Sequence, residues 1–403
     1  MPPVLRILFL NEFFHPDICA SAVVAADHLP KIARLRPDWR ITVLCGDRAW
    51  NDPATIHPSR QVHEGIEIIR VPRPAVSRTN LFRRALGFAA FQRNALRAAK
   101  ELDRIDLVVG TTAPPQGGTI ARKIAHARGC PFIYKVFDLY PDLAVALGHT
   151  REGSFIHRRW LAADTLAMRE AAAVVCIADG MTRRLLRTRN LAAQRLQTIH
   201  DGYDSARLHF DGPNHFRERY NPEGRFVVQY AGNMGLSHPF ETILSAARTL
   251  AADDSILFQF IGDGPQRENI RMNLPPGAQL LDYQPPELLG QVLATADVCL
   301  ISQSETMCDM ALPYKIYANL AAARPVIFIG NAQSEIAEWL ESAGAGCCVS
   351  QGRPRDLVEA LLAYRNDPAR RAAAAVAAKS LFDARFDSYK ASSQWMELID
   401  GIL

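Results

Sequence analysis

The sequence predicts an α/β protein built from two doubly wound domains, each a parallel sheet covered by helices on both faces. Short runs rich in Val and Ile alternate with helical segments, and this alternation restarts once after a polar stretch. The runs are continuously apolar, which is typical of strands buried on both faces of a parallel sheet. A chain of 403 residues also exceeds what one ordinary hydrophobic core organises, so two domains are expected.

The first half of the chain contains six apolar runs that we interpret as strands, with helical patterns between them. The predicted strands are VLRILFLN, WRITVLCG, IEIIRVP, IDLVVGTT, PFIYKVFD and AAVVCIAD, and the predicted helices cover 20–35, 81–101, 117–128 and 155–171. This repeated β-α rhythm predicts the first parallel sheet.

A polar stretch with Gly and Pro, HDGYDSARLHFDGPNHFRERYNPEG at 200–224, separates the two halves and is interpreted as the linker. The strands predicted after it are FVVQYAG, ILFQFIGDG, AQLLDY, DVCLIS, PVIFIG and AGCCVS, with helices at 239–252, 265–273, 286–295, 314–323, 333–342 and 354–364. The last segment, 368–401, is Ala-rich and helical. We therefore predict domains at 1–205 and 206–385, and a C-terminal helix at 386–403 that could pack back on the first domain.

Composition favours a cytoplasmic globular protein. Hydrophobic residues make up 48% of the chain and charged residues 22%, and no apolar run approaches the roughly 18 residues of a membrane span. The opening MPPVLRILFLNEFF enters a strand pattern directly, without the features of a signal peptide. The eight cysteines are scattered without a C-x-x-C pair, so we expect reduced core residues.

Charge is divided unevenly between the halves. Residues 1–205 hold 29 Lys and Arg against 19 Asp and Glu, a balance of +10, whereas the remainder holds 17 against 23, a balance of −6. The basic half either meets an anionic partner or is simply well solvated. Its helix at 80–100 is amphipathic and basic; it could rest on an anionic membrane, or bury its apolar face on its own sheet. Nucleic acid is not expected as a partner, because no aromatic platform accompanies the basic residues.

Two glycine-bearing turns follow strands in the second half. Glycines at a strand-to-helix turn let backbone N–H groups approach a phosphate, although tight turns use the same residues. The turns lie in YAGNMGLSH and FIGDGPQRENI, and their candidate ligand-binding residues are Gly232, Asn233, Gly262, Asp263 and Gly264. After the next strand, Tyr283 could cover a nucleotide base, or it is an ordinary packing residue.

These turns, together with ATADVCLIS and PYKIYANLAAARPVI, form one ordered pattern. Residues 226–349 resemble the nucleotide-sugar-binding domain of retaining GT-B glycosyltransferases of family 4, especially the bacterial colanic-acid and O-antigen enzymes that include N-acetyl-L-fucosamine transferases. The first half resembles the same group through FHPDICASAVVAADHLPKIA, VVGTTAPPQGGTIA and KVFDLYPDLAVALG. The resemblance implies two Rossmann-like domains facing a central cleft, a UDP-sugar as donor without a further cofactor, and a lipid-linked saccharide as acceptor.

The donor side departs from the family pattern. Many members carry two glutamates eight residues apart, and those positions fall on Met310 and Ala318 here. Most members also supply Arg and Lys from the loop after the first strand of this domain, where this chain has no cation. Because a departing diphosphate needs a cation, we predict that Lys315 provides it, helped by the free N–H groups of its helix; the alternative is a snorkelling surface lysine. The subgroup that this chain resembles usually carries Pro-Ser-Lys-(Ile/Leu)-Tyr, which residues 313–317 match apart from Tyr314 in place of Ser. This resemblance also assigns Pro313 and Tyr317 to the nucleotide-sugar site.

The acceptor side is predicted from the first half. Asp138 lies just beyond a strand's carboxyl end, where it could accept the acceptor proton or hold the donor sugar, unless it caps the next helix. Asp142 follows it in a D-x-x-x-D spacing unlike the D-x-D of metal-dependent transferases, so no metal is expected. The remaining candidates either shape the acceptor pocket or only form a well-turned loop; they are Thr111, Thr112, Gly117 and Gly118.

The resemblance implies a retaining transferase that moves a sugar, expected to be a 2-acetamido sugar, from UDP to a lipid-linked saccharide in surface polysaccharide biosynthesis. Two alternatives stay open from sequence alone. A non-hydrolysing sugar-nucleotide epimerase shares the two-domain architecture and needs no acceptor. A catalytically inert subunit would explain the missing glutamates. For the transferase we expect a cytoplasmic location with peripheral contact at the inner face of the plasma membrane.

Overall fold

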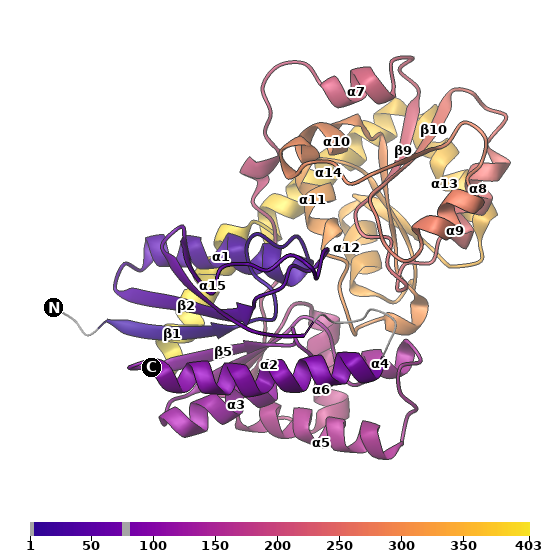
Figure 1. The fold of residues 1–403 in the computed structure, drawn as a ribbon. Coiled ribbons are helices and arrows are strands. Elements are labelled where there is room, and N and C mark those ends of the chain that lie inside the picture. The colour runs from indigo at the N-terminus through magenta and orange to yellow at the C-terminus, as the bar shows by residue number, and fades with distance from the viewer. Residues whose placement is uncertain (1–3, 75–80) are drawn as a thin grey trace. The chain divides into compact units, whose positions relative to one another are not determined.

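The structure, a computed structural model, describes residues 4–74 and 81–403. It divides into two compact units (Figure 1). Unit 1 comprises Met1–Asp201, Met310–Leu312 and Ser388–Leu403, and unit 2 comprises Gly202–Asp309 and Pro313–Asp387. Within the described residues, no helix has both the length and the apolar composition that a membrane span requires.

Unit 1 is built on an eight-stranded sheet with the order β3-β4-β2-β1-β5-β6-β7-β8. Every pairing is parallel except that of β3 with β4. The strands are β1 (Leu5–Leu10), β2 (Trp39–Gly46), β3 (Arg60–His63), β4 (Ile66–Val71), β5 (Leu107–Thr111), β6 (Phe132–Val136), β7 (Ala173–Cys176) and β8 (Leu196–Thr198). The six predicted strands are confirmed. Strands β3 and β8 were not predicted, because they are short edge strands without an apolar run.

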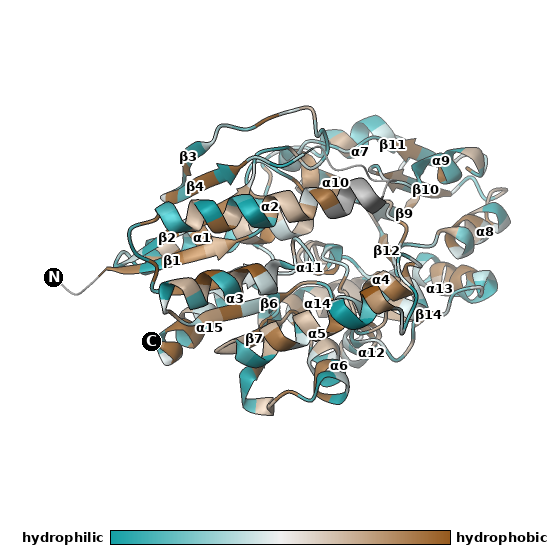
Figure 2. Cartoon of the chain, turned by 60° about the horizontal axis from the view of Figure 1, so that its bottom comes forward, coloured by the Kyte–Doolittle hydropathy of each residue, from teal (hydrophilic) through white to brown (hydrophobic). Residues whose placement is uncertain are grey.

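Helices cover both faces of this sheet. They are α1 (Ala20–Leu35), α2 (Leu81–Glu101), α3 (Gly117–Arg128), α4 (Asp142–Ala146), α5 (Phe155–Glu170), α6 (Asp179–Arg189) and α15 (Ser388–Ile402). Helices α1 and α15 pack together on one face, whereas α2, α3 and α5 form a layer on the other, which Figure 2 brings forward. This division follows from right-handed crossovers, because the chain moves along the sheet in opposite directions on either side of β1.

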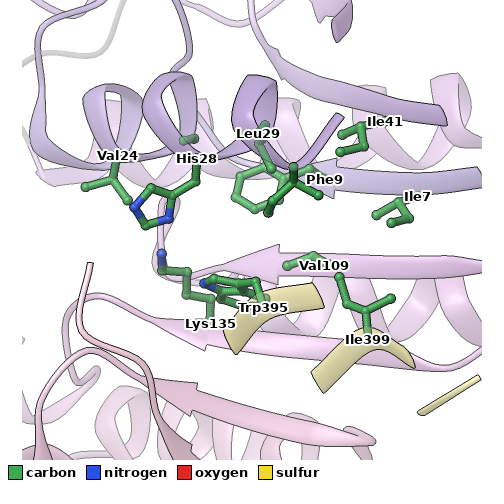
Figure 3. Close-up of a pocket in the computed structure, with 12 residues that line it drawn as sticks. Ile7, Phe9, Val24, His28, Leu29, Ile41, Val109, Lys135, Trp395 and Ile399 are labelled. Carbon is green, nitrogen blue, oxygen red and sulfur yellow. The ribbon is translucent and has the colours of Figure 1, made fainter. Parts of the chain in front are cut away.

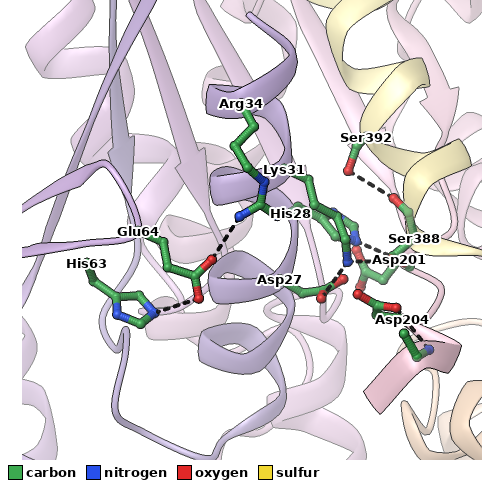
Figure 4. A network of polar contacts seen from close by, with 11 residues as sticks. Asp27, His28, Lys31, Arg34, His63, Glu64, Asp201, Asp204, Ser388 and Ser392 are labelled. Atoms are coloured by element: carbon green, nitrogen blue, oxygen red, sulfur yellow. Dashed lines mark hydrogen bonds and ion pairs between the residues drawn. The ribbon is translucent and has the colours of Figure 1, made fainter. Parts of the chain in front are cut away.

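A buried polar network ties α15 to α1 within unit 1 (Figure 4). The Lys31 ammonium donates to Asp27 Oδ1 at 2.7 Å and to Ser388 Oγ at 2.8 Å. Nearby, the Lys135 ammonium lies 2.6 Å from the carboxylate of Asp201, whose carbonyl oxygen accepts from His28 Nε2 at 2.7 Å. Burial, reinforced by the charge of Lys135, lowers the pKa of His28 to about 4, so this imidazole is neutral at physiological pH.

A small cavity of about 30 Å³ lies between these groups and the sheet (Figure 3). Its walls are apolar and come from α1, α15 and the strands, and His28 and Lys135 lie at one end. A cavity of this size holds about one water molecule, so it is a packing feature and not a substrate pocket.

Unit 2 contains a six-stranded parallel sheet with the order β11-β10-β9-β12-β13-β14. The strands are β9 (Phe226–Ala231), β10 (Ile256–Ile261), β11 (Gln279–Leu281), β12 (Val298–Ser302), β13 (Val326–Ile329) and β14 (Gly346–Val349). All six were predicted. The helices are α7 (His215–Tyr220), α8 (Glu241–Thr249), α9 (Arg267–Met272), α10 (Leu289–Thr295), α11 (Lys315–Ala321), α12 (Glu335–Ala343), α13 (Pro354–Asn366) and α14 (Pro368–Arg385).

Three helices of the structure, α4, α6 and α7, were not predicted. The predicted linker at 200–224 contains α7, whose first turn is capped by the Asn214 side chain accepting from the Arg217 N–H at 2.9 Å. The helical segment at 368–401 consists of α14, in unit 2, and α15, in unit 1, and α15 lies within the C-terminal segment 386–403. The break falls at Phe386, whose ring is fully buried against other aromatic rings. Continuing the helix would remove that ring from the core.

Candidate functional site

In unit 2, the turns after β9 and β10 are joined by backbone hydrogen bonds. The N–H of Gly232 donates to Ile261 O at 2.8 Å, and the N–H of Met234 donates to Asp263 O at 2.8 Å. The N–H of Gly262 donates to the next strand end, Leu281 O, at 3.0 Å. The expectation that the glycine N–H groups approach a phosphate is therefore wrong for Gly232 and Gly262, because both groups already have protein partners.

These glycines are needed for close backbone approach. Gly262 has φ +134°, and a Cβ there would lie 2.1 Å from Gly232 O. Gly264 has φ +147°, and its Cβ would lie 2.6 Å from Met234 O. Only glycine allows the two turns to meet at this distance.

Substituting Gly262 by alanine should destabilise the chain by about 3 kcal/mol, since the new Cβ combines an unfavourable φ with a backbone clash. Gly277→Ala is the matched control, because Gly277 has φ +77° but no atom within 4 Å of the position that a Cβ would take, and it should cost only about 1 kcal/mol. Urea unfolding of both variants measures the difference. Equal losses of unfolding free energy in the two variants would show that the close contact between the turns contributes nothing to stability.

The side chain of Lys315, the first residue of α11, extends over the hydrogen-bonded turns that follow β9 and β10. Its ammonium lies 3.7 Å from the centroid of the Tyr230 ring and 3.4 Å from Asn233 O. The Tyr230 hydroxyl donates to the same Asn233 oxygen at 2.8 Å, which fixes the ring beneath the ammonium. A Cβ on Gly232 would lie 3.4 Å from Lys315 Cε, so the glycine leaves room for the lysine. The lysine is therefore held within unit 2 and is not a snorkelling surface side chain.

The charge of Lys315 is not balanced by a carboxylate of any described residue. Burial lowers the pKa of Lys315 to about 7, because desolvation penalises the ammonium. His238, on the loop after β9, donates from Nδ1 to Ser302 O at 2.5 Å. Burial and the nearby Lys315 charge lower the pKa of His238 to about 3, so its ring is neutral. An anionic ligand is the group that would restore the full charge of this lysine.

The other donor-side candidates lie around Lys315 in different environments. Pro313 and Tyr317 are buried, and the Tyr317 ring packs 5.2 Å from that of Phe386. Tyr283 is 39% exposed, as a ring that covers a ligand would need to be. The prediction that the first turn of α11 offers free N–H groups is wrong for Ile316 and Tyr317. The N–H of Ile316 donates to Pro313 O at 3.1 Å, and the N–H of Tyr317 donates to Tyr314 O at 3.2 Å.

In unit 1, Thr112 organises the loop that carries Asp138. Its Oγ1 accepts from the N–H of Phe137 at 2.9 Å and from the N–H of Asp138 at 3.2 Å. Thr111 is fully buried and donates from Oγ1 to Asn11 Oδ1 at 2.6 Å. The two threonines therefore join the carboxyl ends of β1, β5 and β6, which is the edge where ligands of parallel sheets bind.

The Asp138 side chain is partly exposed and pairs with no cation among the described residues. Burial raises the pKa of Asp138 to about 6, which suits a group that exchanges a proton near neutral pH. The alternative of a helix cap is not supported, since α4 begins after Pro141 without a side-chain cap. Residues 310–312, just before Lys315 in sequence, belong to unit 1, and there Ala311 forms a β-bridge with Asp138.

The remaining acceptor-side candidates have structural partners. Asp142 forms ion pairs with Arg189 and, at 3.4 Å, with Arg184, and so links α4 to α6. Gly117 and Gly118 open α3, where a Cβ on Gly117 would lie 1.8 Å from Thr111 O and one on Gly118 would lie 2.4 Å from the Tyr134 ring. These contacts give the glycines a packing role; their contact with an acceptor stays a prediction.

Sequence reasoning missed Tyr230 and the buried pair of Glu12 and Arg73. Tyr230 lies inside an apolar strand run, and nothing in that run signals a ring beneath a cation. Arg73 Nη1 lies 2.5 Å from Glu12 Oε1, and its guanidinium lies 4.4 Å from the Phe13 ring. The pair holds the loop after β1 against the chain that follows β4.

The described part of the basic helix α2 has both buried and exposed apolar side chains, since Leu86 is 53% exposed. Phe91, Ala95 and Ala99 are buried at helical spacing, whereas Arg93 and Arg97 face outward. The side chains of 81–85 lie outside the described residues. In the part that the structure describes, α2 therefore presents arginine charge together with the exposed Leu86, and its contact with a membrane stays a prediction.

Comparison with known proteins places the chain in a family. Residues 29–202 match the family described as "Glycosyl transferase 4-like domain", and residues 225–367 match "Glycosyl transferases group 1". The chain is 25% identical over 315 residues to the probable glycosyltransferase WbjE of Pseudomonas aeruginosa, covering 76% of both chains. It is 26% identical over 147 residues, 35% of each chain, to the putative colanic acid biosynthesis glycosyl transferase WcaI of Escherichia coli K12.

The fold is also similar to that of a solved structure. Anabaena HepE, in complex with UDP-glucose, superposes with a TM-score of 0.72 at 17% identity, covering 98% of this chain and 100% of HepE. The predicted GT-B fold class, with two parallel-sheet Rossmann-like domains, is thereby confirmed. The chain belongs to the glycosyltransferases that join a 4-like domain to a group 1 domain.

Proposed function

We propose that this glycosyltransferase moves a sugar, expected to be a 2-acetamido sugar, from a UDP-sugar to a hydroxyl of a lipid-linked saccharide during surface polysaccharide biosynthesis, with retention of configuration. The observation that carries the donor side is Lys315, a cation held over Tyr230 without a carboxylate partner among the described residues. UDP-glucose bound to HepE and the colanic acid role in the name of WcaI support the donor and the pathway.

In this proposal, the bond from the anomeric carbon to the UDP oxygen breaks, and a bond from that carbon to the acceptor oxygen forms. The diphosphate leaves with the electron pair, and Lys315 stabilises its developing charge. Tyr283 and the Gly262–Gly264 turn flank the base, and Asn233 lies near the diphosphate. Asp138 receives the acceptor proton; if it holds the donor sugar instead, the oxygen of the departing diphosphate takes that proton. No metal is required in this scheme, because the ammonium supplies the positive charge.

A thermal-unfolding screen of nucleotides and UDP-sugars tests the donor proposal. A ligand that binds only the folded chain raises the unfolding temperature, and a concentration of about 100 times Kd stabilises by about 2.7 kcal/mol. We expect UDP and one or a few UDP-sugars to raise it, with ADP and GDP as controls that do not. Stabilisation by ADP and not by UDP would contradict the proposal that the donor carries a uracil base. Incubation with the selected UDP-sugar and no acceptor should leave the sugar unchanged; an epimerised product would instead favour an epimerase.

A further inference from the structure

The first turn of α5 in unit 1 exposes two neighbouring large apolar side chains. Phe155 is 66% exposed and Ile156 is 68% exposed. Among the described residues, no other two consecutive large apolar residues are both exposed. The turn is well formed, because the Ser154 hydroxyl accepts from the N–H of His157 at 3.2 Å. Neighbouring exposed apolar side chains form a contiguous patch, and contiguous apolar patches rimmed by polar residues mark interaction surfaces.

Basic residues flank this apolar pair in the sequence. Arg151, Arg158 and Arg159 are exposed, and the Arg159 guanidinium lies 5.4 Å from the Phe155 ring centroid. With Glu152 as the acid of this stretch, residues 151–159 carry a net charge of +2, from three arginines and one glutamate. Aromatic and aliphatic side chains flanked by arginines match the boundary between headgroups and acyl chains of an anionic membrane. A protein partner of matching chemistry would need an acidic rim around an apolar pocket.

The position of this turn relates it to the acceptor side of the same unit. Helix α5 begins on the side of the sheet where the parallel strands end, which is also where Asp138 lies. The rings of Tyr140 and Trp160 stack at 5.4 Å with an interplanar angle of 11°, and so fix the start of α5 to the loop that follows Asp138. An acceptor whose lipid tail stays in the bilayer needs its saccharide presented at this edge.

We propose that the first two turns of α5 dock unit 1 on an anionic lipid surface. Phe155 and Ile156 insert at the level of the headgroups, and Arg158 and Arg159 contact lipid phosphates. The purpose of the contact rests on the proposed function, which requires a lipid-linked acceptor. The contact itself depends only on residues of unit 1. It lies on a different helix from the contact predicted through 80–100, which stays a separate prediction.

Co-sedimentation of the full chain with vesicles tests the docking. The wild type should bind vesicles containing phosphatidylglycerol, bind phosphatidylcholine vesicles far less, and release as salt is raised. The double variants Phe155→Ser with Ile156→Ser and Arg158→Gln with Arg159→Gln should each bind roughly tenfold more weakly or worse. Met272→Ser is the matched control, because Met272 is 68% exposed in unit 2, and it should bind like the wild type.

Several outcomes would overturn the docking. One is that the wild type does not bind anionic vesicles. Another is that both α5 double variants bind these vesicles as strongly as the wild type does. Loss of binding on Arg93→Gln with Arg97→Gln, with both α5 variants intact, would assign the contact to α2. A change from dimer to monomer in the α5 variants at constant vesicle binding would identify a protein interface. UDP-induced thermal stabilisation of the same variants separates the two proposals, because donor binding involves unit 2 and should not change.

Discussion

Replacing Lys315 by alanine should lower turnover by ~100-fold or more, because the departing diphosphate loses the cation that neutralises it. The ammonium lies above the Tyr230 ring, and no described carboxylate competes for its charge. Single-turnover rates with a UDP-sugar and a lipid-linked acceptor measure the effect. The fold should persist, because the Lys315 side chain contributes one long hydrogen bond of 3.4 Å to the joined turns.

The pKa of Lys315, about 7 in the unliganded chain, predicts how donor binding depends on pH. A diphosphate favours the ammonium form, so UDP should bind best below pH 7, and its affinity should fall by up to about tenfold per pH unit above it. Lys315→Arg should keep its charge throughout this range and remove the alkaline decline. Calorimetric titration with UDP across this range measures both proteins.

Lys379→Ala is the control for the Lys315 variants. Lys379 lies on α14 of unit 2, where it pairs with Asp383 one helical turn away, and its loss should change neither turnover nor UDP affinity. Unchanged turnover in Lys315→Ala would remove this lysine from the mechanism. A wild-type affinity for UDP that is flat between pH 6 and 9 would show that the ammonium does not meet the diphosphate.

The fold could be predicted from sequence because the strand signal is local. A parallel strand buried on both faces needs a continuous apolar run, and runs such as FVVQYA and ILFQFI reveal it without knowledge of their neighbours. The errors fall where that constraint is weak. Strand β3 lies at a sheet edge and its Val62 is 70% exposed, so it carries no apolar run. Strand β8 lies at the opposite edge of the sheet and is only three residues long.

The candidate site could be predicted only in part, for the same reason. Lys315 and Asp138 were found from motifs and strand ends, which are local features. The ring beneath Lys315 belongs to Tyr230, far earlier in the sequence, and no periodicity connects the two residues. The acceptor that a backbone N–H finds is equally non-local, since the N–H of Gly232 donates to a carbonyl oxygen on the neighbouring strand β10. Sequence patterns therefore located the turns but misassigned their hydrogen bonds.

Converting Asp138 to asparagine should abolish transfer while UDP affinity stays near that of the wild type. Asparagine keeps the size of the side chain and leaves the backbone bonds from Thr112 intact, but it cannot accept a proton. In the wild type, burial holds the pKa of Asp138 at about 6, so kcat/KM should fall as the pH drops through 6 and this carboxylate becomes protonated.

Asp142→Asn provides the comparison, because Asp142 lies in the same D-x-x-x-D spacing but pairs with Arg184 and Arg189. Its loss should lower stability by several kcal/mol, since it leaves buried arginine charge uncompensated, while the surviving folded fraction still transfers sugar. The two variants therefore separate a carboxylate that exchanges a proton from one that holds two helices together. If Asp138→Asn lost UDP binding as well as transfer, Asp138 would act on the donor, and the acceptor hydroxyl would need another base.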